Sequence, residues 1–578
     1  MKKLPVTICA IVISAIGGFI AMGQSASQQE VSPDIALSRN LTIFNTITRY
    51  LAQTYVDSVR PDAAFDAAIA AMLNTIDPYT EYYNAKEKER LEIMTTGAYG
   101  GIGAMVQSGS NGLDTYISMP IEGSPSYKAG LKAGDKIIRV DTVDVTGKTT
   151  SFTTKLLKGD PGTLVTVKVV RPYATDSILL FDIIRGKVQD KSVPFYGVKD
   201  GIGYVKLTSF MEKSADEMKE ALESFKANPE VKGVILDLRD NGGGLVSTSV
   251  DILGMFLPKG TKVIETRGKT PDSYKSYTTS TSPLLPTMPL VVLIDGESAS
   301  ASEITAGAVQ DLDRGVLVGE RSYGKGLVQG TYTLPYDGLL KVTTAKYHLP
   351  SGRLIQALDY SHRNPDGSVA RTPDSLTNEF LTSRGRTVRD GGGLVPDSVV
   401  PRPEYSRLLY NLVMTNQIFD YATKFAATHP TIAPAGEFKV TDEIYADFVA
   451  FVDTTKIKSD KVGERMLEDM RKTARQEGFL TDELDASFDS LVPLLAPDLK
   501  RDLMNKRDEI EEFLGREIVS RYYGRAGEEE YGLQFDQDYF VARDILKNPK
   551  LYESILQPPK GKTAAKQAKS PKKTQKKR

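Results

Sequence analysis

Three serines stand together in the sequence DGESASASE at residues 295–303, directly after the apolar run 290–294. A serine at the turn between a strand and a helix is exposed, and the unpaired N–H groups of the helix start can stabilise an oxyanion beside it. The spacing Ser300-x-x-Glu303 also fits a capping box, so helix capping alone is the competing interpretation. The segment offers a nucleophile if a base lies close to it.

A lysine is the base that this sequence favours. A serine nucleophile requires a base, and the chain contains only three histidines. Lys325 stands between glycines in the sequence YGKG at 323–326. Small neighbours let a lysine enter a tight pocket, where burial favours its neutral form. A phosphate-binding loop is the rival interpretation, but the Walker sequence requires Ser or Thr where this chain has Gly326.

A buried strand is expected at 231–238, and the glycine turn NGGG at 241–244 follows it within the sequence DLRDNGGG. From about residue 203 apolar runs alternate with helical patterns, which predicts parallel strands, crossover helices and a sheet covered on both faces. The carboxyl ends of such strands meet at one edge, where ligands bind. We therefore expect this turn, Ser300 and Lys325 at the same edge of the sheet.

A second glycine-rich loop has the sequence YGGIG at 99–103. Together with AGLKAGDKII at 129–138, it resembles the carboxylate-binding loop of PDZ domains. Successive glycines let N–H groups converge on a carboxylate, and the following strand can accept an extended peptide as an added strand. We predict peptide binding by Gly100, Gly101, Ile102 and Gly103. A hairpin without a ligand is the alternative, while a dinucleotide loop lacks the preceding strand and the acidic residue that it needs.

Taken together, the serine and lysine segments resemble a known family. SASASEI at 298–304 and GERSYGKGLVQ at 319–329 are similar to the signature of carboxyl-terminal processing (tail-specific) serine proteases. Shorter matches stand in the same order: LDLRDN at 236–241, TTAKY at 343–347, PSGR at 350–353 and GLVPD at 393–397. The resemblance runs from about residue 40 to residue 402 and includes an inserted PDZ module.

The resemblance implies roles for individual residues. Ser300 would be the nucleophile, Lys325 its general base, and Gln329 the residue that orients the lysine. Backbone N–H groups of Ala301 and Gly243 would form the oxyanion hole. The reaction would pass through an acyl-enzyme and would require no metal, nucleotide or other cofactor.

The glycine turn departs from the family in one position. The family commonly has Pro or Ser where this chain has Gly242. A third glycine can loosen the turn, which leaves the choice between Gly243 and Gly244 open.

The fold class implied is multidomain α/β, with a crotonase-like α/β protease core. The expected segments are a signal peptide at 1–23, an N-terminal helical segment at 31–96, a PDZ domain at 97–185, a serine protease core at 186–403, a C-terminal helical region at 404–557 and a basic disordered tail at 558–578. Within them, the apolar run 163–170 is expected to be the last PDZ strand. Residues 500–523 are expected to form one amphipathic helix that ends at Gly524.

Composition excludes several classes of site. The single cysteine, Cys9, lies in the N-terminal apolar segment, so a mature protein without that segment has no thiol, disulfide or iron–sulfur site. The three histidines lack the spacing of a zinc site. The chain has a formal net charge of −1, and residues 558–578 hold eight Lys, one Arg and no acidic residue, so the rest of the chain is near −10 and nucleic acid is not the expected partner.

The N-terminus has the pattern of an export signal. Lys2 and Lys3 precede an apolar run from Leu4 to Met22, and Ala21-Met22-Gly23 fits a small-x-small cleavage site. An uncleaved membrane anchor is the alternative. In both cases the catalytic body would lie outside the cytoplasm, and we expect a periplasmic protein.

These observations predict an exported serine endopeptidase acting on proteins with accessible apolar C-terminal tails. The alternatives are a catalytically inactive PDZ-containing adaptor and, with less support, an acyl-CoA enzyme on a crotonase-like core. The C-terminal helical region could bind an adaptor, mediate self-association or simply cap the core. The basic tail could contact an anionic membrane surface or remain solvated.

Overall fold

The computed structural model describes residues 32–457, 462–495 and 498–558 of the 578-residue chain. The signal-peptide prediction for 1–23 therefore lies outside the described residues, as does the prediction for the basic tail beyond residue 558. The chain divides into two units, residues 1–78 and 79–578, which are described separately. In the described ranges, no helix is both long enough and apolar enough to cross a membrane.

The described residues of the first unit form two helices, α2 (Pro33–Thr54) and α3 (Pro61–Asn74), each with proline in its first turn, where the missing N–H costs nothing. Phe44 and Phe65 meet edge to face, with ring centroids 5.5 Å apart. The expected helical segment 31–96 is correct for these helices and for α4 (Lys88–Thr96), but it missed a strand, β1 (Glu81–Tyr83). This strand is short, and its hydrogen-bonding partner is distant in the sequence.

The PDZ unit is entered and left through two strands that pair with each other, β2 (Ala98–Gly101) and β9 (Gly186–Gln189). Its main sheet has the order β3-β4-β5-β7-β8, with β6 beside β5, and β3 lies at one edge. The strands are β3 (Ala104–Ser108), β4 (Thr115–Pro120), β5 (Lys136–Val140), β6 (Val143–Asp144), β7 (Leu164–Val170) and β8 (Ile178–Ile184), and the helices are α5 (Pro125–Ala129) and α6 (Thr150–Leu157). Residues 163–170 are not the last strand as expected, because β8 follows and pairs with β7 over its whole length.

The protease core is built on a sheet with the order β10-β11-β12-β15-β16-β23. Its strands are β10 (Phe195–Lys199), β11 (Ile202–Lys206), β12 (Gly233–Asp237), β15 (Leu290–Ile294), β16 (Val316–Gly319) and β23 (Ser398–Val399). All neighbours are parallel except β10 and β11. The central strands β12 and β15 are buried along their whole length, as expected for a parallel sheet covered on both faces.

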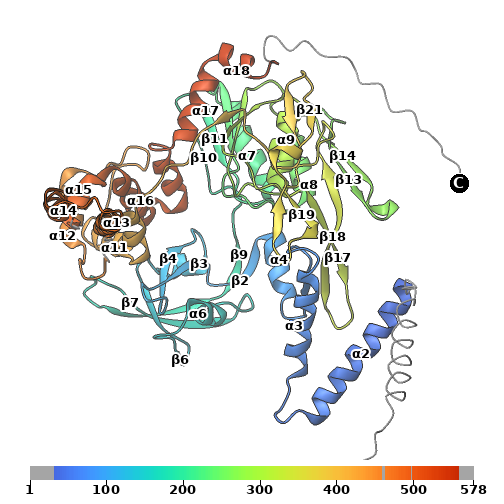
Figure 1. Cartoon of the computed structure of the whole chain (residues 1–578), viewed down its shortest axis with the longest axis horizontal. Helices are drawn as coiled ribbons and strands as arrows, with labels where there is room; N and C mark the ends of the chain where they lie inside the picture. Colours follow the sequence, from blue (N-terminus) through green and yellow to red (C-terminus); the bar gives the residue numbers. More distant parts are fainter. Residues whose placement is uncertain (1–31, 458–461, 496–497, 559–578) are drawn as a thin grey trace, which may run out of the picture. The chain divides into compact units, whose positions relative to one another are not determined.

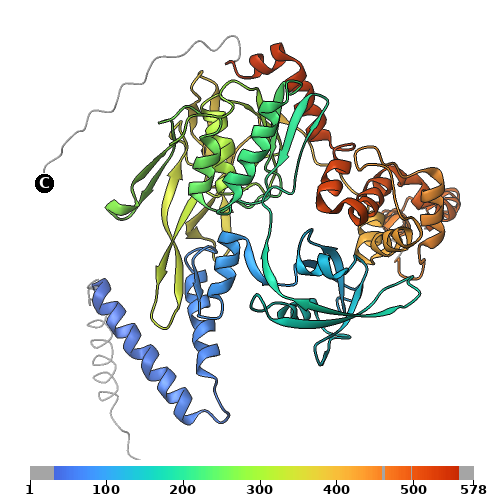
Figure 2. The same cartoon turned by 180° about the vertical axis from the view of Figure 1, so that it is seen from behind.

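The two faces of this sheet are covered by helices from different parts of the chain (Figures 1 and 2). One face packs against α7 (Ser214–Ala227), α8 (Val246–Leu253) and α9 (Ala301–Asp311). The other face packs against α17 (Gln537–Lys547) and α18 (Pro549–Ile555). The last two helices therefore complete the protease core, although the sequence placed them in the separate region 404–557.

A second sheet, of antiparallel strands, lies beside the core. It has the order β1-β18-β13-β14, and β17 also pairs with β18. Its further strands are β13 (Lys262–Gly268), β14 (Lys275–Thr278), β17 (Leu327–Thr333) and β18 (Leu339–His348). Two hairpins follow, β19 (Leu358–Arg363) with β20 (Val369–Arg371) and β21 (Glu379–Leu381) with β22 (Thr387–Arg389).

The remaining C-terminal helices pack around two hydrophobic cores of their own, a large one and a small one that lies between residues 467 and 488. They are α10 (Arg407–Met414), α11 (Gln417–Thr428), α12 (Asp442–Phe451), α13 (Val462–Gln476), α14 (Asp482–Leu495), α15 (Leu499–Asn505) and α16 (Arg507–Gly532). The prediction of a single helix at 500–523 is wrong in detail, because the helix is interrupted at Lys506. At Gly524 the φ of +61° produces a kink, and the helix then continues to Gly532.

Candidate active site

Ser300 occupies the turn between β15 and α9, at the carboxyl edge of the core sheet. It is the N-cap of α9 and has φ +56° and ψ −112°, a conformation that a residue with a side chain rarely adopts. Such strain is typical of functional turns, where the surrounding structure holds the residue in place. The first N–H groups of α9, beginning with that of Ala301, have no partner within the helix.

Only the middle serine of the three is accessible. Ser298 and Ser302 are completely buried, whereas Ser300 is partly exposed. The Ser298 hydroxyl donates to the carbonyl of Leu238 at 2.8 Å, and the Ser302 hydroxyl donates to the carbonyl of Asn241 at 2.8 Å. The outer serines therefore join the serine turn to the glycine turn, and Ser300 alone remains for chemistry.

Glu303 connects the serine turn to the lysine loop. One carboxylate oxygen accepts the N–H of Ser300 at 3.0 Å and that of Lys325 at 2.8 Å. The other accepts the N–H of Gly324 at 2.7 Å and the hydroxyl of Ser322. The capping-box interpretation is thus correct for the Glu303 side chain, but the same carboxylate also orients the loop that carries Lys325.

The environment of Glu303 is unusual for a carboxylate. The side chain is completely buried, and this burial raises its pKa to about 7, although the four hydrogen bonds act in the opposite direction. A charged carboxylate accepts all four bonds, whereas a protonated one must donate through one oxygen. The ionised form therefore holds both loops best.

Lys325 lies in the loop between β16 and β17 and is partly buried. Its Nζ lies 4.2 Å from the centroid of the Tyr79 ring. Its backbone carbonyl accepts the hydroxyl of Tyr347 at 2.7 Å, and the carbonyl of Ser300 lies 3.3 Å from the same hydroxyl. Glu303 and Tyr347 thus hold the backbone of both predicted catalytic residues, which brings the predicted pair to one edge of the core.

Gln329 lies on β17, next to a bulge in its pairing with β18. Its side-chain Nε2 donates to the hydroxyl of Thr343 at 3.1 Å. The side chain is therefore anchored to β18, and an orienting role toward Lys325 stays a prediction.

The glycine turn packs directly against the serine turn. A Cβ on Gly243, which has φ +98°, would lie 2.6 Å from the carbonyl oxygen of Ala299 and 2.8 Å from the nitrogen of Ala301. The N–H of Gly243 donates to Asn241 Oδ1 at 2.8 Å, so this amide would have to leave Asn241 to bind an oxyanion. Gly244, with φ +147°, adjoins it, and the choice between the two amides stays open.

Gly242 differs from its neighbours. Its φ is not positive, and a Cβ there would meet nothing within 4 Å. The turn therefore has room for a side chain at this position, so the third glycine is not required by packing.

The predicted peptide loop divides into two parts. Gly100 and Gly101 belong to β2 and pair with β9, whereas Ile102 and Gly103 form the turn into β3. Ile102 is 3% exposed and packs in the PDZ core, so its side chain presents little surface, and its role in peptide binding stays a prediction. The carbonyl of Gly103 accepts the hydroxyls of two serines in the 124–126 turn, which fixes the start of β3. Because β3 is an edge strand, it can take up a further strand.

Three segments of the chain match known domain families. Residues 201–362 match peptidase family S41, residues 100–181 a PDZ domain, and residues 408–546 the C-terminal helical domain of probable PDZ-proteases. The carboxy-terminal-processing protease of Bartonella bacilliformis is 33% identical over 361 residues, which cover 62% of this chain and 81% of that protein. The chain belongs to peptidase family S41.

Two further proteins are similar to this chain over about three fifths of its length. The carboxy-terminal processing protease CtpA of Bacillus subtilis is 30% identical over 351 residues, covering 61% of this S41 peptidase and 73% of that protein. Among solved structures, the photosystem II D1 C-terminal processing protease is 27% identical and covers 62% of this chain and 86% of its own, with a TM-score of 0.33. The protein is therefore a serine-type peptidase with a PDZ domain and a C-terminal helical domain.

Several residues that hold the candidate site together were not predicted from the sequence. Glu303 was visible only as a capping residue, and Tyr347 only as part of a motif. Tyr79 follows a helix break in the sequence, with no signal that it reaches Lys325. Asn241 stands in the glycine turn, and its contacts to Ala299 and Ser302 depend on the folded sheet edge.

Proposed function

We propose that this peptidase cleaves exported proteins that are recognised by their accessible, apolar C-terminal tails, through a Ser300–Lys325 dyad. The observation that carries the proposal is the accessibility of Ser300 at the strained start of α9, between two buried serines and beside the lysine loop. The names of the relatives support the substrate class, since the Bartonella and Bacillus proteins are carboxy-terminal processing proteases.

In the proposed mechanism, neutral Lys325 takes the hydroxyl proton of Ser300 as the oxygen attacks a peptide carbonyl. The carbonyl electrons move to the oxygen, which is stabilised by the N–H of Ala301 and one amide of the glycine turn. Collapse expels the amine, which takes the proton from Lys325, and leaves an acyl-enzyme. Water then attacks the ester with Lys325 again as base, which frees Ser300 and the new C-terminus.

The PDZ domain would supply the tail specificity. An extended tail would add to the free edge of β3, with its carboxylate at the loop that begins at Ile102. A location in the periplasm is part of the proposal. It rests on the N-terminal sequence, where a positive start precedes an apolar run.

The test uses an unfolded protein with an apolar C-terminal tail, and the same protein with the tail carboxylate amidated. Ser300→Ala and Lys325→Ala should abolish cleavage in proteins that keep the wild-type circular dichroism spectrum, and amidation should slow the wild type. Lys269→Ala, which removes an exposed lysine from a loop outside the site, is the control and should cleave normally. Cleavage by Ser300→Ala at the wild-type rate would refute the dyad, and a folded wild type without activity would favour a binding-only protein.

A further inference from the structure

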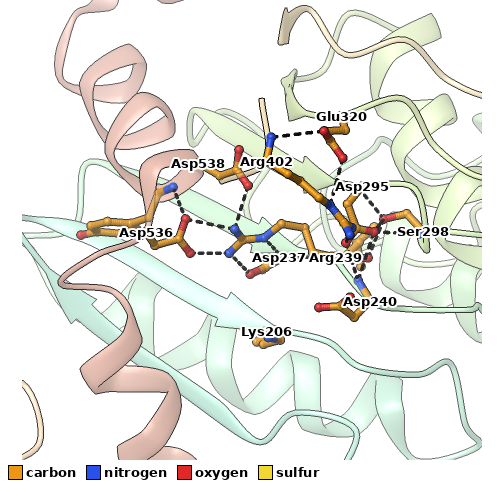
Figure 3. A network of polar contacts seen from close by, with 12 residues as sticks. Lys206, Asp237, Arg239, Asp240, Asp295, Ser298, Glu320, Arg402, Asp536 and Asp538 are labelled. Carbon is orange, nitrogen blue, oxygen red and sulfur yellow. Dashed lines mark hydrogen bonds and ion pairs between the residues drawn. The ribbon is translucent and has the colours of Figure 1, made fainter. Parts of the chain in front are cut away.

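The N-terminus of α17 reaches the strand end that leads into the glycine turn (Figure 3). The Nη1 group of Arg239 donates to Asp536 at 3.0 Å and to Asp538 at 2.8 Å. The Nη2 group donates to Asp536 at 2.5 Å and to Asp237 at 2.6 Å, and Nε donates to Asp237 at 3.0 Å. A guanidinium has five N–H donors. These five hydrogen bonds to three carboxylates therefore use all of the donors of Arg239.

This cluster is mostly shielded from water. The side chain of Asp237 is completely buried, and those of Arg239, Asp536 and Asp538 are 17%, 12% and 19% exposed. Asp536 is itself fixed as the N-cap of α17, where it accepts the N–H of Tyr539 at 3.0 Å. Forked hydrogen bonds between arginine and carboxylates define direction as well as distance, so the guanidinium has one orientation here.

A short stretch of hydrogen-bonded backbone joins Arg239 to the glycine turn at 241–244. Because this turn would help to form the oxyanion hole, it is called the oxyanion turn below. Asp240 has φ +58°, and its N–H donates to Asp295 at 3.2 Å. Asn241 then donates to the carbonyl of Leu207 at 2.7 Å, accepts the N–H of Gly243 at 2.8 Å, and accepts the N–H of Ala299 through its own carbonyl at 3.0 Å. A displacement of Arg239 therefore moves the contact between the two turns.

Packing alone does not hold this stretch. A cavity of about 570 Å³ lies between the carboxyl edge of the sheet and helices α16 and α17, and Arg239 and Asp240 line it together with Asp536 and Asp538. One side of the strand end therefore faces open space, and polar contacts must fix its position.

We propose that Asp536 and Asp538 are positioning residues for the oxyanion turn: by holding Arg239, the C-terminal helical region completes the active centre. The inference rests on the proposed function, since the turn matters only if Ser300 forms a tetrahedral intermediate. The proposal gives two residues about 300 positions from Arg239 in the sequence an effect on transition-state stabilisation, which they exert through Arg239.

The same helix offers a matched control. Arg543 of α17 lies 3.4 Å from Asp200, in the turn between β10 and β11. Because β11 begins after that turn, this ion pair joins α17 to the amino edge of the sheet, away from the glycine turn. Arg543→Gln weakens the docking of α17 without touching Arg239.

The experiment compares wild type, Asp536→Asn/Asp538→Asn and Arg543→Gln in the full-length protein. Asparagine keeps the N-cap of α17. The readouts are kcat and KM on a tailed peptide substrate, and the inhibition constant of a peptide boronate. The tetrahedral boronate adduct of Ser300 places an oxygen where the oxyanion would form, so its affinity reports the oxyanion hole directly.

We expect the double variant to lose about 10- to 100-fold in kcat and in boronate affinity, with KM within twofold, while Arg543→Gln stays within twofold in all three. If the double variant is folded and keeps kcat and boronate affinity, or if Arg543→Gln loses as much, the inference is overturned. If the double variant does not fold, the single variant Asp538→Asn is tested instead. We expect it to lose twofold to tenfold in kcat and in boronate affinity. A folded single variant that loses neither would overturn the inference. Wild-type protein without Ser300-dependent cleavage would overturn the proposed function as well, whereas an active wild type with an unaffected variant overturns the inference alone.

Discussion

Asp237 and Glu303 are both completely buried carboxylates at one edge of the same sheet, yet their pKa values shift in opposite directions. Burial is the largest cause for each and raises the pKa. At Asp237 the charge and hydrogen bonds of Arg239 outweigh it and hold the pKa at about 2. Glu303 receives only neutral N–H and O–H donors, so its pKa stays at about 7.

This contrast shows that the two halves of the proposed active centre are held in different ways. The half that carries the oxyanion turn is fixed by a charge-compensated cluster, and its charge partners come from the far end of the chain. The half that carries Ser300 and Lys325 is fixed by one uncompensated carboxylate from the first turn of α9. The first half should therefore be sensitive to loss of a charge, and the second should be sensitive to pH near neutrality.

Arg239→Leu should have the largest effect, because it removes the compensation that defines the first half. Three buried or nearly buried carboxylates would be left together, and loss of one partner of a buried ion pair costs about 3–5 kcal/mol. The free energy of unfolding from urea titration should fall by that amount at pH 7, and less at pH 4, where the carboxylates can protonate. Arg543→Leu is the control, and an equal loss there would show that any α17 contact matters as much.

Gly243→Ala tests the point where the two halves meet. A Cβ there would collide with Ala299 and Ala301, in a backbone conformation that disfavours side chains. We expect kcat to fall about 10²- to 10³-fold, the effect of losing an oxyanion donor. Gly242→Ala meets no atom within 4 Å and should stay near the wild-type rate. Equal losses at both positions would contradict this distinction.

Glu303→Gln tests the second half. The amide nitrogen cannot accept hydrogen bonds, so two of the four contacts to the serine and lysine loops are lost. We expect kcat to fall about 10- to 100-fold, on the basis of roughly 1 kcal/mol for each bond. Glu297→Gln, an exposed neighbour in the same turn, should change little.

Glu303 should also make the stability of the wild type depend on pH, and the sign of this dependence follows from the raised pKa of Glu303. The folded state holds its proton on Glu303 up to about pH 7, whereas an unfolded glutamate loses it near pH 4.5. The wild type should therefore lose stability through Glu303 as pH rises from about 4.5 to 7, with no further change above that range. Thermal unfolding across this window should show the slope in the wild type, and a parallel slope in Glu303→Gln would assign it to another group.

Tyr79→Leu should have the smallest effect. The aromatic ring beside Lys325 favours the charged ammonium, whereas leucine keeps the apolar volume without the π face. Because the proposed mechanism requires neutral Lys325, we expect kcat to rise with pH as this lysine loses its proton. In Tyr79→Leu that rise should move to lower pH by about half to one unit. Tyr79→Phe keeps the ring and should keep the wild-type profile, while a shift to higher pH in the leucine variant would show that the ring acts mainly by excluding water.

Local patterns were sufficient to predict much of the core. The buried run 290–294 became β15 with the predicted bounds, and the helix expected after Ser300 became α9, because apolar runs and helix starts are written in neighbouring residues. The motif resemblance also led to the family that the relatives confirm. The same reasoning missed β1 and β8, whose pairing partners cannot be read from their own few residues.

Patterns of adjacent residues predicted the serine, lysine and glycine-turn segments, the α/β core and the PDZ domain, since each of these is encoded within a short stretch of the chain. Three features required the folded chain: the accessibility of one serine, the contacts of Glu303 with both loops, and the cover that α17 and α18 give to one face of the protease sheet. The physical reason is that burial and ion pairing are properties of the folded packing. Asp536 lies 297 residues from Arg239 in the chain and 2.5 Å from it in space.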